Sequence, residues 1–205
     1  MPGLTRERIL ETAVRMADRD GLDAVTLRGI AGELGVHVTS LYNHVPTRDA
    51  ITDGIVEVLL DEAKLPTQPV NWEEWVRGFF AAIGTIAVTH PGAFAALQRR
   101  PVQGALAASS FEIALAAFDK AGLDTQDAYA AVKATALSAL AVGLERAMLS
   151  QGVEAETSLD ALPAEQFPHI RSMAEVTDPE AAWSFSLETL VSGLRAQVRR
   201  RRSAG

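Results

Sequence analysis

Side chains that could contact a nucleic acid gather in one short stretch of the sequence, residues 37–48. Asn43 has the paired donor and acceptor that can read an adenine edge, and Thr39 or Val38 can touch the methyl group of a thymine. Side chains of this kind suit an exposed helix face that enters a major groove. The candidate base-contacting residues are His37, Val38, Thr39, Ser40, Asn43 and His44.

A second group of residues suits contacts to phosphate. Tyr42 and Arg48 can hold phosphate oxygens, and free backbone amides at the start of a helix assist both Arg48 and Thr26. Arg28 can bind either a guanine or a phosphate. Alternative roles stay open for three of these side chains: a partly buried Tyr42, a solvated His37 in a turn, and a His44 that packs in the core instead of contacting DNA.

The elements that must present these side chains are predicted as a helix-turn-helix. Thr26 can cap a short helix over residues 27–34, and Gly35 supplies the turn. A second short helix follows over residues 38–44 until Pro46 ends it. Other helical hairpins have similar dimensions, so the pattern alone leaves an ordinary helix pair open. Close packing would rest on the small Ala31 and on a shared core of Ile30, Leu34, Val36 and Leu41.

The rest of the chain is predicted to be helical as well, because its apolar residues recur at three- and four-residue steps. We expect an all-α fold of about ten helices. Pro66 and Pro69 follow a helix that Thr47 caps, which predicts a head at residues 1–63 and a larger body at residues 64–205. In the body, Asn71 with Glu74 and then Asp124 are predicted to cap helices, and further helices are expected over residues 102–121, 163–174 and 179–200.

The charge of the chain is unevenly distributed. The formal net charge of the 205 residues is −7, which on its own argues against nucleic acid as a partner. Residues 1–50, however, carry six arginines against seven acidic residues, whereas residues 51–205 carry thirteen basic and nineteen acidic residues. The negative charge belongs to the body, and the nearly neutral head can approach DNA.

Signatures of enzymes and of secreted proteins are absent from the sequence. There is no cysteine, which excludes disulfides and thiolate metal sites. The four histidines form no metal-spaced pair, and neither a glycine-rich phosphate loop nor a G-x-S-x-G motif occurs. The N-terminus lacks the apolar segment of a signal peptide, and His90-Pro91 interrupts the charge-free stretch from Gly78 to Gln98. We therefore expect a cytoplasmic protein that is not an enzyme and uses no cofactor or metal.

The stretch around the helix-turn-helix resembles the TetR family of transcriptional repressors. The matching residues are Thr5, Ile9-Leu10, Ala13, Gly21, Val25-Thr26, Arg28, Ile30-Ala31, Leu34-Gly35-Val36, Ser40-Leu41-Tyr42, His44-Val45 and Arg48. Residues 41–45 are most similar to the tetracycline-repressor branch, and the region of Trp183, Phe185 and Leu194 resembles its final helix more loosely. The resemblance implies a ligand-responsive repressor that binds a palindromic operator as a homodimer and is released by a small organic effector.

The resemblance also implies an effector cavity in the body. Members that bind a magnesium–tetracycline chelate use histidines, whereas the corresponding position here is Lys64, so we expect a largely apolar effector bound without metal. Other interpretations stay open: ordinary core packing for Phe79 and Ile83, and a solvated face for Glu112. The residues that the resemblance places around the cavity are Phe79, Ile83, Leu97, Arg100, Ser109, Glu112, Ile113, Val132 and Thr135.

Two long helices of the body are expected to form a four-helix dimer interface with a second copy. The candidate interface residues are Leu140, Leu144 and Met148 on one helix and Leu187, Leu190, Val191 and Leu194 on the other. The helix over residues 47–63 is continuous with head and body and is the expected route from effector to DNA. Two other classes stay open: a helical small-molecule-binding protein without sequence-specific DNA binding, and an enzyme with an unrecognised site. The intact motif over residues 26–48 favours the repressor.

Overall fold

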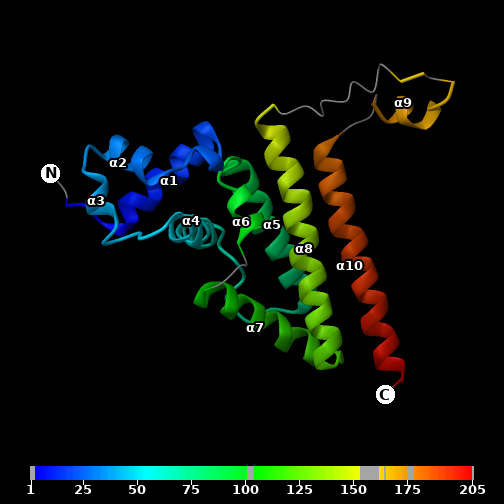
Figure 1. Cartoon of the computed structure of the whole chain (residues 1–205). Coiled ribbons are helices and arrows are strands. Elements are labelled where there is room, and N and C mark those ends of the chain that lie inside the picture. The colour runs from blue at the N-terminus through cyan, green and yellow to red at the C-terminus, as the bar shows by residue number, and fades with distance from the viewer. Residues whose placement is uncertain (1–2, 101–103, 153–161, 164, 175–177, 205) are drawn as a thin grey trace.

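The structure, a computed structural model, describes residues 3–100, 104–152, 162–163, 165–174 and 178–204. Over these residues the chain forms ten α-helices and one short 3-10 helix, and no strand (Figure 1). The all-α fold expected from the apolar periodicity is confirmed. Figure 1 shows the head helices at one end of the molecule and two long antiparallel helices of the body at the other.

The head contains short helices whose ends are set by local signals. It consists of α1 (Arg6–Asp20), the 3-10 helix η1 (Leu22–Ala24), α2 (Leu27–Leu34), α3 (Val38–Leu41) and α4 (Arg48–Glu62). The hydroxyls of Thr26 and Thr47 accept hydrogen bonds from backbone amides in the first turns of α2 and α4, as predicted. Gly35 ends α2 in the left-handed conformation, with φ of 67°, which glycine adopts without strain.

The second helix of the motif is shorter than expected. The sequence predicts helix over residues 38–44, but α3 ends at Leu41 and continues as a turn to His44. Tyr42, after the last helical residue, still has right-handed helical dihedrals, but His44 donates its amide to the Leu41 carbonyl over 2.9 Å, three residues back, so this last turn is tighter than a regular α-helix. Val45 still donates its amide to the Leu41 carbonyl over 2.8 Å, so the side chains of this stretch keep a helix-like spacing.

The body is built around two long helices. It consists of α5 (Trp72–Thr89), α6 (Ala95–Arg99), α7 (Ala105–Lys120), α8 (Thr125–Ser150), α9 (Pro168–Ala174) and α10 (Pro179–Ala204). The predicted capping box of Asn71 and Glu74 opens α5, and Asp124 caps α8. α7 and α9 begin later than predicted, and residues 101–103 and most of the expected loop at 152–163 lie outside the described residues.

α8 is the helix on which most of the body packs. It contacts α5, α6 and α7 on one side and α10, which runs antiparallel to it, on another (Figure 1). Among the described helices, α8 alone is long and apolar enough to cross a bilayer, yet only 33% of that apolar window is buried within the chain. Tyr129 and Leu137, for example, are exposed. Much of this apolar surface is therefore not covered by the chain itself.

The head rests directly on the turn between α5 and α6. A Cβ atom added at Gly92 would lie 2.1 Å from a carbonyl oxygen of α1, so no larger residue fits at this point. The Asp18 carboxylate, also on α1, accepts a hydrogen bond from the Gly92 amide over 3.1 Å and lies 2.7 Å from the His90 ring. The other ring nitrogen of His90 lies 2.7 Å from Glu62, at the end of α4. His90 therefore ties the last turn of α5 to two helices of the head.

Candidate nucleic-acid interface and ligand cavity

α3 and the turn after it have one buried and one exposed face. Leu41 and Val45 are buried beneath this segment, whereas Thr39, Tyr42 and Asn43 are exposed. The exposed residues follow one another at three- and four-residue steps, so they lie on one face of the helix. This polar face has the side-chain chemistry that major-groove readout requires.

The other candidate DNA contacts lie on α2 and around α3. His37 is exposed at the N-cap position of α3, and its side chain makes no capping hydrogen bond. Thr26 and Arg28 are exposed at the start of α2, where the Thr26 hydroxyl accepts from the Gly29 amide over 3.0 Å. Their roles on DNA stay predictions, as do those of the half-buried residues Val38, Ser40 and His44.

Arg48, the first residue of α4, already contacts a carboxylate. Its guanidinium group lies 3.3 Å from both a carboxylate oxygen and the backbone carbonyl of Asp23. Asp23 also accepts two hydrogen bonds from Arg99 of α6, at 2.7 and 3.0 Å. The hydrogen bonds and charge of Arg99, with a smaller contribution from Arg48, lower the pKa of Asp23. Asp23 therefore joins a predicted phosphate contact to the body.

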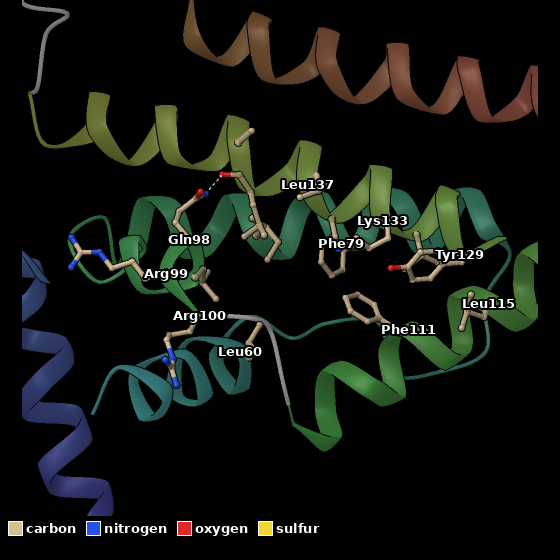
Figure 2. Close-up of a pocket in the computed structure, with 16 residues that line it drawn as sticks. Leu60, Phe79, Gln98, Arg99, Arg100, Phe111, Leu115, Tyr129, Lys133 and Leu137 are labelled. Carbon is tan, nitrogen blue, oxygen red and sulfur yellow. Dashed lines mark hydrogen bonds between the residues drawn. The ribbon is translucent and has the colours of Figure 1, made fainter. Parts of the chain in front are cut away.

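A cavity of about 850 Å³ lies between α4, α5, α6, α7 and α8 (Figure 2). This volume is within the range of ~300–1,000 Å³ that is typical of small-molecule sites. The predicted ligand-binding residues that line it are Phe79, Ile83, Leu97, Arg100 and Val132. Lining residues that were not expected at a cavity are Leu60, Gln98, Arg99, Phe111, Leu115, Tyr129, Lys133, Ala136, Leu137, Leu140 and Ala141. Many of these residues lie on α8. They follow from Val132 by successive three- and four-residue steps, so helical periodicity could have predicted them.

The expected contribution of α7 to the cavity is wrong in its register. Ser109 and Glu112 are exposed, and Ile113 lines a different surface pocket near the start of α5. Phe111 and Leu115 face the cavity instead. Successive helical residues are rotated by about 100°, so an error of one or two positions selects another face of the helix. Within the described residues, no cluster of histidine, aspartate or glutamate side chains is arranged to hold a metal ion.

The wall between α5 and α7 is aromatic. The rings of Trp75 and Phe79 stack with centres 5.1 Å apart, and the Phe79 ring lies 5.9 Å from that of Phe111. The buried Trp75 indole donates a hydrogen bond to the Ser110 hydroxyl over 3.1 Å. Thr135, predicted at the cavity, is buried in α8 without lining it and donates its hydroxyl to a carbonyl one turn earlier, over 2.9 Å. The polar groups behind this wall are thus already paired.

α6 connects the cavity with the head. Leu97, Arg99 and Arg100 line the cavity, but the guanidinium groups of both arginines point away from it (Figure 2). Arg99 binds Asp23 of η1, and Arg100 binds Asp53 of α4 with hydrogen bonds of 2.6 and 3.0 Å. The hydrogen bonds to Asp53 raise the pKa of Arg100. One short helix therefore has a cavity side and a head side.

We call the polar contacts between head and body the seam. Its members are Asp18, Asp23, Asp53 and Glu62 in the head and His90, Gly92, Arg99 and Arg100 in the body. Burial opposes protonation of His90, but the hydrogen bonds to Asp18 and Glu62 outweigh burial and raise the pKa of His90 above its ordinary value of 6.5. The protonated ring is the form that can donate to both carboxylates.

The predicted dimer residues differ in how far the single chain already buries them. Val191 and Leu194 are buried within the single chain, because α10 packs on α5 and α8, and so they present no surface to a partner. Met148, by contrast, is 44% exposed, and Phe185, on the same helix as the buried pair, is 74% exposed. The remaining candidates, Leu140, Leu144, Leu187 and Leu190, are half-buried.

An exposed polar helix-turn-helix, joined through α4 to a cavity of ligand size, defines this protein as a ligand-responsive DNA-binding regulator. Comparison with known proteins agrees. Residues 9–54 match the family of bacterial regulatory proteins called the tetR family, and residues 65–198 match the tetracyclin repressor-like C-terminal domain. The chain belongs to this family of transcriptional regulators.

Similar proteins are transcriptional regulators as well. The HTH-type transcriptional repressor DrrR1 of Streptomyces coeruleorubidus is 28% identical over 98% of this chain and 81% of its own length. An HTH-type transcriptional regulator of Saccharopolyspora erythraea is 34% identical, but the match spans 63% of this chain and only 56% of that protein. ActR of Streptomyces coelicolor, a TetR family protein, is 26% identical. Its apo structure has a TM-score of 0.80 over 98% of this chain and 99% of ActR, and its complex with actinorhodin has a TM-score of 0.79 over 96% and 99%.

Proposed function

We propose that this protein is a cytoplasmic repressor that binds an inverted-repeat operator as a homodimer and leaves it when a small, largely apolar organic molecule enters the cavity. The observation that carries the proposal is the position of α4. Arg48 opens this helix beside the helix-turn-helix, and Leu60 near its other end lines the cavity. A ligand that changes the packing around Leu60 therefore acts on the helix that carries the head.

The two parts of the chain divide this work. The head at residues 1–63 reads DNA, and the body at residues 64–205 binds the effector and dimerises. The end of α4 supports this boundary, since the helix stops at Glu62 and Lys64 takes a φ of 52°, which lies outside the right-handed helical region.

On DNA, the exposed face of α3 enters the major groove. Asn43 and Thr39 read base edges there, while Tyr42 and Arg48 hold phosphates. When DNA binds, the Arg48 guanidinium group leaves the Asp23 carboxylate for a phosphate, or it contacts both groups. Recognition helices in adjacent major grooves lie about 34–36 Å apart, which a single copy of the head cannot span, so the operator is an inverted repeat.

α8 and α10 supply the dimer surface. Phe185 of α10 and Met148 of α8 are exposed by 74% and 44%, and a partner that covers these two packed helices would bury both side chains. Half-buried Leu144 and Leu187 extend the surface along the same two helices. A four-helix bundle with a second copy would cover these residues.

The effector releases the protein from the operator because it binds more tightly to one packing arrangement of the chain than to the other. A hundredfold loss of operator affinity requires a ligand that prefers the non-binding arrangement by about 2.7 kcal/mol. The aromatic wall of Phe79 and Phe111 suits an organic molecule. The complex of ActR with actinorhodin supports the same use of this fold, because ActR matches 96% of this chain in structure.

DNA binding is tested with the Tyr42→Ala and Asn43→Ala double variant. Fluorescence anisotropy on DNA that flanks the gene should show loss of specific binding, while the thermal melt stays unchanged because both side chains are exposed. Tyr129→Ala, which removes an exposed tyrosine of the body, is the control and should bind as the parent does. Unchanged operator affinity in the double variant would instead support a ligand-binding protein that does not read DNA.

Dimerisation is tested by sedimentation velocity. Phe185→Glu should shift the protein toward the monomer and weaken operator binding with it, because a charge on an apolar interface is unfavourable. Val88→Glu places the same charge at a half-exposed apolar position of α5 and should leave the mass unchanged. A Phe185→Glu variant that sediments as a dimer contradicts this interface.

A further inference from the structure

His90, which follows the last residue of α5, lies between two carboxylates of the head. Its Nδ1 atom lies 2.7 Å from Asp18 of α1, and its Nε2 atom lies 2.7 Å from Glu62, the last residue of α4. In the described part of the chain, these two carboxylates are the charged groups that act on the ring. Burial lowers the pKa of His90, but the hydrogen bonds to the carboxylates outweigh burial and raise it. Only a protonated ring can donate to both carboxylates at once.

The two carboxylates are held unequally. The Asp18 side chain is 23% exposed, and its carboxylate also accepts hydrogen bonds from the Gly92 and Ala93 amides, over 3.1 and 3.0 Å. The Glu62 side chain is 50% exposed, so water can replace the histidine there at little cost. A neutral ring has one N–H group, which stays on the carboxylate that is held in place. The neutral ring is therefore expected to carry its hydrogen on Nδ1, beside Asp18.

Loss of the proton therefore frees the end of α4 but leaves the contact with α1. An unprotonated Nε2 atom and a carboxylate are both acceptors, so no hydrogen bond can join them. We call the hydrogen bond between protonated His90 and Glu62 the latch. Glu62 lies two residues after Leu60, which lines the cavity. A proton at His90 and a ligand beside Leu60 thus act on the same turn of α4.

We propose that the latch makes DNA binding depend on pH: it forms when His90 is protonated, holds α4 in the orientation that binds the operator, and breaks when the ring is neutral. This inference rests on the proposed function, to which it adds the proton as a second signal. A free α4 must be ordered when the heads of a dimer bind DNA, and this ordering lowers the affinity. Because the latch orders α4 beforehand, it should raise operator affinity at acidic pH.

An NMR titration of the full-length protein tests the latch itself. Nitrogen chemical shifts of the imidazole distinguish the two neutral tautomers, and His90→Gln identifies the signals of His90 among the four histidines. The parent should show a raised pKa for His90 and a neutral ring with its hydrogen on Nδ1. Glu62→Gln should lower that pKa, because a carboxamide carries no charge. A pKa of His90 at or below 6.5 in the parent, or a neutral ring with its hydrogen on Nε2, overturns the proposal.

Fluorescence anisotropy on DNA that flanks the gene tests the effect on the head. A carboxamide at position 62 can accept from a protonated ring or donate to a neutral one, so Glu62→Gln keeps the contact at every pH. Asp61→Asn is the control, because it removes the same charge from the exposed neighbouring residue. Relative to this control, Glu62→Gln should bind about threefold more tightly at about pH 9 and equally at about pH 6. Glu62→Ala lacks the contact, so it should match the control at about pH 9 and bind about threefold more weakly at about pH 6.

The outcomes separate this inference from the proposed function. If DNA binds but the ratio of affinities between Glu62→Gln and Asp61→Asn does not change with pH, the latch has no effect on the head and only this inference is wrong. A ratio that rises toward acidic pH also overturns it, because the latch would then hold an orientation that does not fit the operator. If neither the parent nor any variant binds DNA at either pH, the proposed function fails and the pH dependence fails with it, whatever the titration of His90 gives.

Discussion

The seam and the interior of the body are built from opposite kinds of contact. The interior buries large apolar side chains completely, among them Trp75, Phe80 and Phe118. The seam pairs charged side chains that stay in contact with water, such as Arg99 and Asp23, whose side chains are 49% and 78% exposed. Buried apolar packing and exposed ion pairs differ in how much a small displacement costs.

That difference indicates how a change of packing in the body could shift the position of the head. An exposed ion pair stabilises by about 0–1 kcal/mol and can be exchanged for water at little cost. Close-packed apolar side chains lose contacts as soon as they shift. We therefore expect that the seam can change while the body keeps its cavity intact, and that any movement of the head occurs at the seam. Gly92 is the exception within the seam, because it packs against backbone.

The largest effect is expected at Gly92, where the seam is tight rather than polar. Gly92→Ala should lower the free energy of unfolding by about 3 kcal/mol, because its Cβ would collide with the backbone of α1. Gly32→Ala is the control, since a Cβ at this position of α2 meets no atom within 4 Å and should be neutral or slightly stabilising. Urea denaturation measures both. Equal stability of the two variants would mean that the head does not rest on this turn.

The next largest effect is expected in the body interior. Ser110→Ala should lower the free energy of unfolding by about 2 kcal/mol, because it leaves the buried Trp75 indole without an acceptor. The adjacent Ser109→Ala removes an exposed hydroxyl and should change stability by less than about 0.5 kcal/mol. Thermal melts of the pair give the comparison. A neutral Ser110→Ala would show that this interior tolerates an unpaired donor.

A smaller effect, on communication rather than stability, is expected from the arginines of α6. The double variant Arg99→Gln and Arg100→Gln should bind a releasing compound as the parent does, but the ratio of operator affinities without and with it should fall about fivefold. Arg77→Gln breaks an exposed pair with Glu188 inside the body and should leave this ratio unchanged. Operator titrations at saturating compound provide the measurement. An unchanged ratio in the double variant would assign the coupling to α4 alone.

The smallest effect is expected from His90 and depends on pH. Because the pKa of His90 is raised in the folded protein, its contribution is fully present below the ordinary pKa of 6.5 and is lost as the pH rises through the raised value. The parent should exceed His90→Gln in stability by at most about 1 kcal/mol near the acidic end of this range, with the difference shrinking toward alkaline pH. Urea titrations at several pH values check the sign. A difference that grows with pH contradicts the protonated bridge.

The helix-turn-helix was predictable because its contacts are local. Thr26 caps α2 through an amide three residues away, and Gly35 ends it in a conformation that few other residues adopt without strain. Alternation of exposed Thr39 and Asn43 with buried Leu41 follows from helical periodicity alone. The shortened α3 could not be predicted from Pro46, because a proline restricts only the residue before it, which is Val45.

The cavity was predictable only in part. Phe79 and Ile83 lie on the apolar face of α5, and that face must turn inward whatever packs on it. α7 has small apolar residues on several sides, so its sequence does not select the face that turns to α5 and α8. The placement of Ser109 in the cavity was therefore wrong, and its neighbour Ser110 is the buried residue.

The sequence by itself determined the all-α class, the capped starts of α2, α4, α5 and α8, and the exposed polar face of the head, because each depends on side chains within a turn or two of one another. Only the tertiary structure decided the seam and the helix faces that line the cavity. Arg99 and Asp23 are 76 residues apart, and exposed charges carry no periodic signal that could pair them. Which carboxylates the two arginines of α6 bind depends on how α6 packs between the head and α8.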